Sequence, residues 1–146
     1  MNKWDSRFIE LAYLVSSWSK DPSTKCGAVI TQGKRVVSMG FNGFPVGISD
    51  DKDRYRDREL KYKIVLHAEV NAILFANQSL VGCTLYVVPM PPCCQCASKI
   101  IQSGIKRIVS IEPSKEQINR WGDDFDITFR MFHESGVYFE YLNHRR

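Results

Sequence analysis

The 146-residue chain lacks long apolar runs, internal repeats and low-complexity segments. A membrane-spanning helix needs about 20 consecutive apolar residues, and no segment approaches that length. Residues 1–15 carry charges within their apolar pattern and have no cleavage-site signal, which argues against a secretory signal peptide. We therefore predict a cytoplasmic protein that has no membrane partner.

A dense cluster of basic residues is also missing. The 20 lysines and arginines are set against 16 aspartates and glutamates, for a net charge of +4. Dedicated nucleic-acid binders usually concentrate basic residues on one face, so we predict no nucleic-acid partner. The length and the 44% hydrophobic content favour a single domain, 1–146, with a real core.

Cysteine, in contrast, is concentrated: three of the five cysteines lie within residues 93–96. In a reducing compartment such a cluster indicates metal binding or catalysis rather than disulfide bonds. Cys26 and Cys83 lie in or beside expected strands, and we interpret them as core residues.

The pattern of apolar residues predicts an α/β fold. Residues 5–19 show helical spacing that includes Trp18, with Asp5 or Ser6 as the N-cap. Two β-rich runs then flank a hairpin turn at 32–34. Helices and strands alternate afterwards, with helices expected at 67–78, 94–104 and 126–136 and strands at 84–90, 107–112 and 137–143. This order predicts a three-layer α-β-α sandwich around a mixed five-stranded sheet, with right-handed parallel crossovers in its later part.

Two further segments do not fit this alternation. Residues 51–63 are dense in both charge signs, which is typical of a solvated helix or loop; an insert that faces a ligand is the alternative. Residues 113–126 are interpreted as a long connection, and connections of that length are often functional.

Two expected helices begin with residues that suit a metal site: His67-Ala68-Glu69 in one, and Pro92-Cys93-Cys94-Gln95-Cys96 in the other. Parallel crossovers place both helix starts at one edge of the sheet, where ligand sites of α/β proteins lie. Cys93 and Cys96 share one face of a helical turn, and a helix N-terminus favours thiolates. Two thiolates and the His67 imidazole make a three-ligand zinc site with a position open for water, which is the catalytic pattern.

Glu69 is expected beside that water rather than on the metal. Residues i and i+2 point to nearly opposite sides of a helix, so Glu69 and His67 can converge only at the helix start. Zinc lowers the pKa of a bound water towards neutrality, and a neighbouring carboxylate can transfer its proton. Cys94 with Cys96 is an alternative ligand pair. We favour Cys93 with Cys96 because Pro92 directly precedes Cys93, and Cys94 would then point into packing.

The combination H-x-E and P-C-x-x-C is typical of zinc-dependent nucleobase deaminases. With these motifs the chain resembles the cytidine and deoxycytidylate deaminase superfamily, and within it the dCMP deaminases. The resemblance rests on residues 19–30, 40–51, 67–76, 92–109 and 134–142. It implies a dCMP substrate, hydrolysis at C4 of cytosine to give dUMP and ammonia, and one Zn²⁺ per chain, because 46–66 contain no histidine or cysteine for a second site.

The resemblance also implies residue roles. His67, Cys93 and Cys96 would be zinc ligands and Glu69 the proton shuttle. The expected substrate contacts are the backbone N–H of Ala68 and the side chains of Asn42, Lys25, Ser23 and Trp121. Plainer roles remain open for three of them: a left-handed turn residue for Asn42, solvation for Lys25, and packing for Trp121.

Regulation and assembly are further implications of the resemblance. The family is commonly activated by dCTP and inhibited by dTTP, and it is typically a homo-oligomer, often a hexamer. The expected regulatory residues are Asn42, Gly43, Phe44, Asp50 and Asp51. The carboxylates of this region would require Mg²⁺ beside a triphosphate.

Two alternatives stand against this interpretation. A tRNA adenosine deaminase shares both motifs, but the acidic segments 49–53 and 121–126 would repel an RNA backbone. A structural zinc protein or a non-catalytic nucleotide sensor belongs to another class. A structural site needs a fourth protein ligand, for which Cys94, His133 and His144 are the candidates, and it has no use for Glu69.

Overall fold

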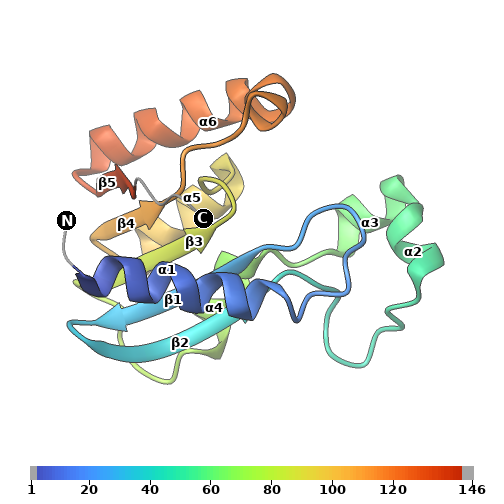
Figure 1. Ribbon diagram of the computed structural model, residues 1–146, viewed down its shortest axis with the longest axis horizontal. Helices are drawn as coiled ribbons and strands as arrows, with labels where there is room; N and C mark the ends of the chain where they lie inside the picture. The colour runs from blue at the N-terminus through green and yellow to red at the C-terminus, as the bar shows by residue number, and fades with distance from the viewer. Residues whose placement is uncertain (1–2, 143–146) are drawn as a thin grey trace.

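A computed structural model describes residues 3–142 and shows a five-stranded sheet in the order β2-β1-β3-β4-β5 (Figure 1). The strands are β1 Gly27–Gln32, β2 Arg35–Phe41, β3 Thr84–Val88, β4 Arg107–Ser110 and β5 Tyr138–Tyr141. β1 pairs antiparallel with β2 and β3, whereas β3, β4 and β5 run parallel. The prediction of a mixed five-stranded sheet is therefore confirmed.

Helices cover both faces of the sheet. They are α1 Lys3–Ser16, α2 Lys52–Arg56, α3 Arg58–Ile64, α4 Ala68–Phe75, α5 Cys94–Ser103 and α6 Lys115–Ser135. On one face α1 packs on Val29, Tyr86 and Val109; on the other, α4, α5 and α6 pack on Ile30 and Leu85. Because neighbouring strand residues point to opposite faces, each central strand contributes to both clusters. This is the predicted three-layer α-β-α sandwich.

Two glycines let helices lie directly on the sheet. A Cβ atom at Gly27 would lie 2.1 Å from the carbonyl oxygen of Ala12 in α1. A Cβ atom at Gly40 would lie 2.5 Å from the oxygen of Ala68 and 2.5 Å from the nitrogen of Ala72, both in α4. α4 can therefore lie this close to β2 only because Gly40 has no side chain.

The predicted start and end of the first helix are wrong. α1 already includes Lys3, so neither Asp5 nor Ser6 is its N-cap. Asp5 is buried instead, where it accepts a hydrogen bond from Tyr86 Oη at 2.6 Å and pairs with Arg107 at 2.8 Å. The helix ends at Ser16 because the following residues form tighter i→i−3 bonds. Trp18 is consequently 51% exposed and lies edge-on to Phe41.

The predicted long connection at 113–126 is wrong as well, because most of it is the first half of α6. Ser114 caps this helix in a reciprocal pair: its side chain accepts from the Gln117 N–H at 3.2 Å, while Gln117 Oε1 accepts from the Ser114 N–H at 2.8 Å. Gly122 and the acidic residues after it interrupt the apolar pattern without ending the helix. Trp121 therefore lies on a helix and not in a loop.

The hairpin is confirmed, with Gln32 paired to Arg35 across a two-residue turn in which Gly33 has a φ of +59°. The charged segment 51–63 forms most of α2 and α3, which lie beyond one end of the sheet (Figure 1). Within residues 3–142, no helix combines the length and the apolar character that a bilayer crossing requires.

Candidate metal and substrate site

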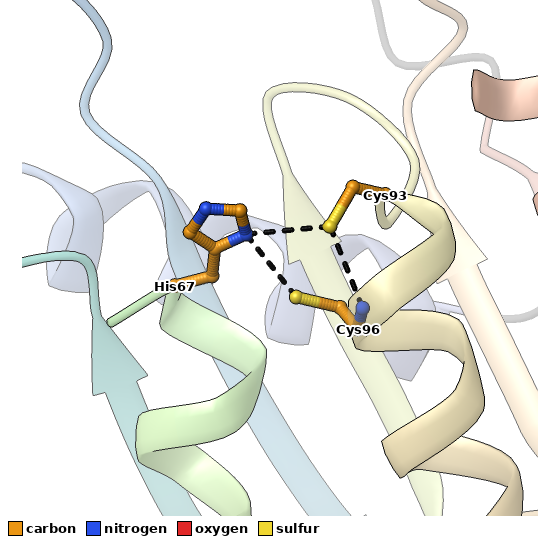
Figure 2. Close-up of side chains that lie close together, drawn as sticks. All are labelled: His67, Cys93 and Cys96. Carbon is orange, nitrogen blue, oxygen red and sulfur yellow. Dashed lines mark hydrogen bonds between the residues drawn. The ribbon is translucent and has the colours of Figure 1, made fainter. Parts of the chain in front are cut away.

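The structure brings His67, Cys93 and Cys96 together at one edge of the sheet. Gly27 of β1 pairs with Phe41 on one side and Val88 on the other, so β2 and β3 end at the same edge. There His67 is the N-cap of α4 and Cys93 is the N-cap of α5. Figure 2 shows the imidazole pointing towards both thiols, and the three potential ligand atoms lie within 4.8 Å of one another.

The spacing of these atoms fits a zinc ion. Bonds of about 2.3 Å to sulfur and about 2.0 Å to nitrogen, at a tetrahedral angle, would separate the two ligand atoms by about 3.5 Å. His67 Nδ1 lies 3.4 Å from Cys93 Sγ and 3.2 Å from Cys96 Sγ. Sulfur and imidazole nitrogen are also the donor types that zinc prefers. The predicted donor set is therefore compatible with the metal in both chemistry and dimensions.

The start of α5 favours a thiolate at Cys93. Its Sγ accepts the backbone N–H of Cys96 at 3.4 Å, as an N-cap side chain does. Hydrogen bonding from Cys96 lowers the pKa of Cys93 to about 4, with a further contribution from His67, although burial opposes the shift. A negative ligand is thus available at neutral pH.

Among the described residues, the group contains no fourth histidine, cysteine or carboxylate ligand. Of the candidates for a structural site, His133 is exposed in α6, and His144 lies outside the described residues. Cys94 is directed to Asp124 instead. If these three side chains held a zinc ion, one position would be left for water, which is the catalytic pattern.

Cys94 does not point into the core, which corrects our expectation. It is half-buried; its thiol donates to Asp124 Oδ1 at 3.0 Å and its backbone N–H donates to Oδ2 at 2.8 Å. The first residue of a helix has no intrahelical partner for its N–H, and Asp124 from α6 supplies one. Of the other two cysteines, Cys83 is a core residue as predicted, whereas Cys26 is half-buried and also lines the cavity described next.

A cavity opens beside the three ligand candidates. Its lining includes His67, Glu69, Cys93, the predicted residues Ser23, Asn42 and Trp121, and the unpredicted residues Asp21, Lys61, Tyr62, Arg120 and Asp124. Glu69 is only 5% exposed. Burial raises the pKa of Glu69 to about 7, and the neighbouring His67 opposes that shift. A carboxyl group with this pKa can both accept and donate a proton near neutrality.

Two predicted substrate residues are not part of the lining. Ala68 is fully buried as the first residue of α4, where only its backbone N–H, left without a partner inside the helix, is suited to a substrate contact. The Lys25 ammonium donates a hydrogen bond to the backbone oxygen of Ser19.

Asn42 holds the loop in front of β1. Its Nδ2 donates to Asp21 at 3.2 Å and to the Thr24 oxygen at 2.9 Å, and its Oδ1 accepts from the Cys26 N–H at 2.8 Å. Among the described residues, only glycines have positive φ angles, so a left-handed turn role for Asn42 is wrong. The Asn42 amide therefore fixes this loop at the wall of the cavity.

Sequence reasoning missed the buried ion pair of Lys61 with Asp21. The ammonium lies 3.0 Å from Oδ1 and 2.9 Å from Oδ2, and both side chains are almost fully buried. The interpretation of 51–63 as a wholly solvated segment is therefore wrong. The alternating charges gave no signal, because the partner of Lys61 lies 40 positions earlier in the chain.

The predicted regulatory residues lie in and after the turn that follows β2. Gly43 forms a bridge with Leu66, Phe44 stacks on Tyr55 with ring centroids 4.2 Å apart, and Asp50 pairs with Lys20 at 2.8 Å. Asp51 precedes α2 without a side-chain capping bond. Of the five, only Asn42 lines the cavity.

Comparisons with known proteins point to one family. Residues 2–112 match the cytidine and deoxycytidylate deaminase zinc-binding region. The chain is 50% identical over 137 residues to an uncharacterized deaminase in the luxG 3′ region of Aliivibrio fischeri, covering 94% of this chain and 92% of that protein. It is 40% identical over 114 residues to deoxycytidylate deaminase of Homo sapiens, and this match covers 73% of this chain and 64% of the human protein.

A solved structure has the same fold. The dCMP deaminase from cyanophage S-TIM5, in complex with dCMP and dUMP, superposes with a TM-score of 0.74 at 24% sequence identity. The match covers 97% of this chain and 99% of the phage chain. The arrangement of strands and helices is thus shared over nearly the full length.

Proposed function

The chain belongs to the cytidine and deoxycytidylate deaminase family, and on that basis we propose that it deaminates dCMP by hydrolysis to dUMP and ammonia. One observation carries this proposal: His67, Cys93 and Cys96 are spaced to hold a zinc ion beside a cavity that the buried carboxyl of Glu69 also lines. A structural zinc site would need a fourth ligand and would have no use for that carboxyl. The relatives named as deoxycytidylate deaminases point to the substrate.

In this proposal His67, Cys93 and Cys96 hold the zinc ion, with Cys93 and Cys96 fixed by the first turn of α5. When bound, zinc would acidify a water molecule and place it for attack on C4 of cytosine. Glu69 would take one proton of that water and deliver it to ring N3, where it stays in uracil, and it would then pass the second proton, from the new C4 hydroxyl, to the departing amine. One water is consumed and one ammonia is released, so Glu69 ends the cycle as it began.

Binding of the base rests on the cavity walls. Val87, Val88 and Phe125 provide apolar lining that limits the access of water to Glu69. The Ala68 N–H lies at the start of α4, where the helix dipole favours a partial negative charge such as the pyrimidine carbonyl oxygen. Trp121 lines the cavity from α6, Ser23 from the segment between α1 and β1, and Asn42 from the position directly after β2, and we assign the last two to contacts with the sugar. The aromatic face suits stacking on a base.

We further propose regulation by dCTP as activator and dTTP as inhibitor at residues 42–51, with Mg²⁺ beside the triphosphate. The bridge between Gly43 and Leu66 supports this idea, because Leu66 directly precedes His67. Binding that moves Gly43 would therefore bear on a zinc ligand.

We also propose a cytoplasmic homo-oligomer, expected to be a hexamer. Its support is the exposed apolar side chains of the edge strand β2 (Val36, Met39 and Phe41), of the turn after α1 (Trp18) and of α4 (Leu74 and Phe75). Exposed apolar patches of this kind are typical of surfaces that associate.

Ammonia release tests the activity. The zinc-loaded protein is incubated with dCMP, cytidine, deoxycytidine and a tRNA anticodon stem-loop, each with and without dCTP or dTTP. We expect release from dCMP that dCTP raises and dTTP lowers. Release from the stem-loop alone would favour the tRNA adenosine deaminase alternative, and no release from any substrate would favour a structural or sensing role.

A further inference from the structure

The cavity has a buried end and an exposed rim. Glu69, at the buried end, is 5% exposed, whereas Tyr62 is 54% exposed and Arg120 is also exposed. A pyrimidine nucleotide whose C4 reaches Glu69 must direct its sugar and 5′ end away from the buried end. The rim is therefore where the rest of such a substrate lies, and this step rests on the function proposed above.

Arg120 carries an unpaired positive charge at that rim. Lys61 also lines the cavity, but its ammonium bonds both carboxylate oxygens of Asp21 in a buried ion pair. Among the lysines and arginines that line the cavity within residues 3–142, Arg120 is the one that forms no ion pair with a carboxylate. Lys25 is not part of the lining.

The carboxylates of the cavity are held away from the rim or compensated. Asp21 is paired with Lys61, and Asp124 receives both the N–H and the thiol of Cys94. Glu69 lies at the buried end. None of the carboxylates that line this cavity is therefore both exposed and without a bonded partner, whereas Asp123 and Asp126 of α6 line a neighbouring hollow that Arg120 also borders.

The guanidinium of Arg120 is also held in place from two elements. Its Nη2 donates to Tyr62 Oη of α3 at 3.2 Å, and its central carbon lies 5.1 Å from the centre of the Trp121 ring in α6. Accepting that bond leaves the Tyr62 hydroxyl proton free to be donated. A planar guanidinium can bind two phosphate oxygens at once. We propose that Arg120 and Tyr62 form a clamp for the 5′-phosphate, so that the enzyme selects nucleoside monophosphates over nucleosides.

The test compares substrates and products with and without the phosphate. In Arg120→Gln we expect kcat/KM for dCMP to fall about 10- to 100-fold, as loss of a charged hydrogen bond predicts, mainly through KM. The value for deoxycytidine should stay within about twofold, because that substrate has no phosphate to lose. Arg130→Gln on the exposed side of the same helix is the matched control and should change neither value.

Equilibrium binding separates this proposal from the proposed activity. Calorimetry on the wild-type protein should show dUMP binding more tightly than deoxyuridine, and Arg120→Gln should remove most of that difference. Arg120→Lys should restore part of it, and Tyr62→Phe should cause an intermediate loss.

Equal binding of dUMP and deoxyuridine by the wild type would overturn the clamp, and so would a loss of selectivity in Lys25→Gln instead of Arg120→Gln. If dUMP bound through Arg120 while dCMP was not deaminated, the activity would be wrong and the clamp would stand.

Discussion

Glu69 combines nearly complete burial with a place in the first turn of a helix, beside the cluster of His67, Cys93 and Cys96. Burial keeps its pKa close to neutrality, so the proton is neither lost permanently nor held permanently. Three carboxyl groups of the described residues line the cavity. Asp21 forms an ion pair with Lys61 and Asp124 accepts a hydrogen bond from Cys94, whereas Glu69 has neither kind of partner.

Replacing this carboxyl with an amide should separate catalysis from metal binding. In Glu69→Gln we expect turnover of dCMP to fall by about 100-fold or more, because proton transfer is lost while the shape is kept. Zinc content, measured by elemental analysis, should match that of the wild type. Glu59→Gln, at an exposed position in α3, serves as the control. Substantial turnover in Glu69→Gln would show that another group moves the proton.

The meeting of His67, Cys93 and Cys96 could be predicted from the sequence because each half of this cluster is local. His67 and Glu69 are two positions apart and Cys93 and Cys96 are three apart, so helical geometry alone relates them. The family prediction rested on these same local motifs, and the comparisons confirm it. Lys61 and Asp124 were missed because their partners, Asp21 and Cys94, lie 40 and 30 positions away. Nothing in a local pattern marks such pairs.

At the scale of helices and strands, α4 is placed by the absence of a side chain at Gly40. The strand and the helix touch backbone to backbone there, and the same helix begins with His67 as its cap and Glu69 in its first turn. Helix position and site geometry are therefore coupled through one residue.

A methyl group at that position should displace the helix. In Gly40→Ala we expect a loss of about 2 kcal/mol in the free energy of unfolding, as in other overpacked contacts, together with weaker zinc binding. Gly122→Ala is the matched control, because its Cβ would lie 3.6 Å from Ile118 in open contact within α6. That change should raise stability by up to about 1 kcal/mol through helix propensity. Urea denaturation and chelator competition measure both quantities, and unchanged zinc affinity in Gly40→Ala would refute the coupling.

Most strands and helices were predicted correctly, but the first half of α6 was not. The strands and the α4 and α5 starts follow from apolar runs and glycine or proline boundaries. The first half of α6 was interpreted as a loop because Gly122 and two aspartates break its apolar face, whereas the Ser114 cap and the contacts of Phe125 and Thr128 stabilise it. Tertiary packing overrode local propensity there.

At the scale of the whole molecule, one polar cluster connects the first helix to the last strands. Arg107 of β4 bonds Asp5 of α1 and Glu140 of β5, and Tyr86 of β3 donates to the same Asp5 carboxylate. Asp5 is only 1% exposed. Side chains from α1, β3, β4 and β5 are therefore joined by the hydrogen bonds and ion pairs around Asp5 and Arg107.

Removal of the cation should weaken the whole fold. In Arg107→Met we expect a loss of about 3 kcal/mol in the free energy of unfolding, because a buried carboxylate loses its main partner. Lys63→Met is the control: its pair with Glu59 is exposed, so the change should stay within about 0.5 kcal/mol. Urea denaturation checks both, and similar losses in the two variants would count against a special role for this cluster.

The two halves of the metal site lie on either side of β3, with 26 positions between His67 and Cys93. An ion shared by both halves would act as a reversible cross-link that closes this loop, and the folded chain would bind it far better than the unfolded one. Occupancy and folding would then be thermodynamically linked, so that bound zinc would raise the free energy of unfolding of the chain as well as support its activity.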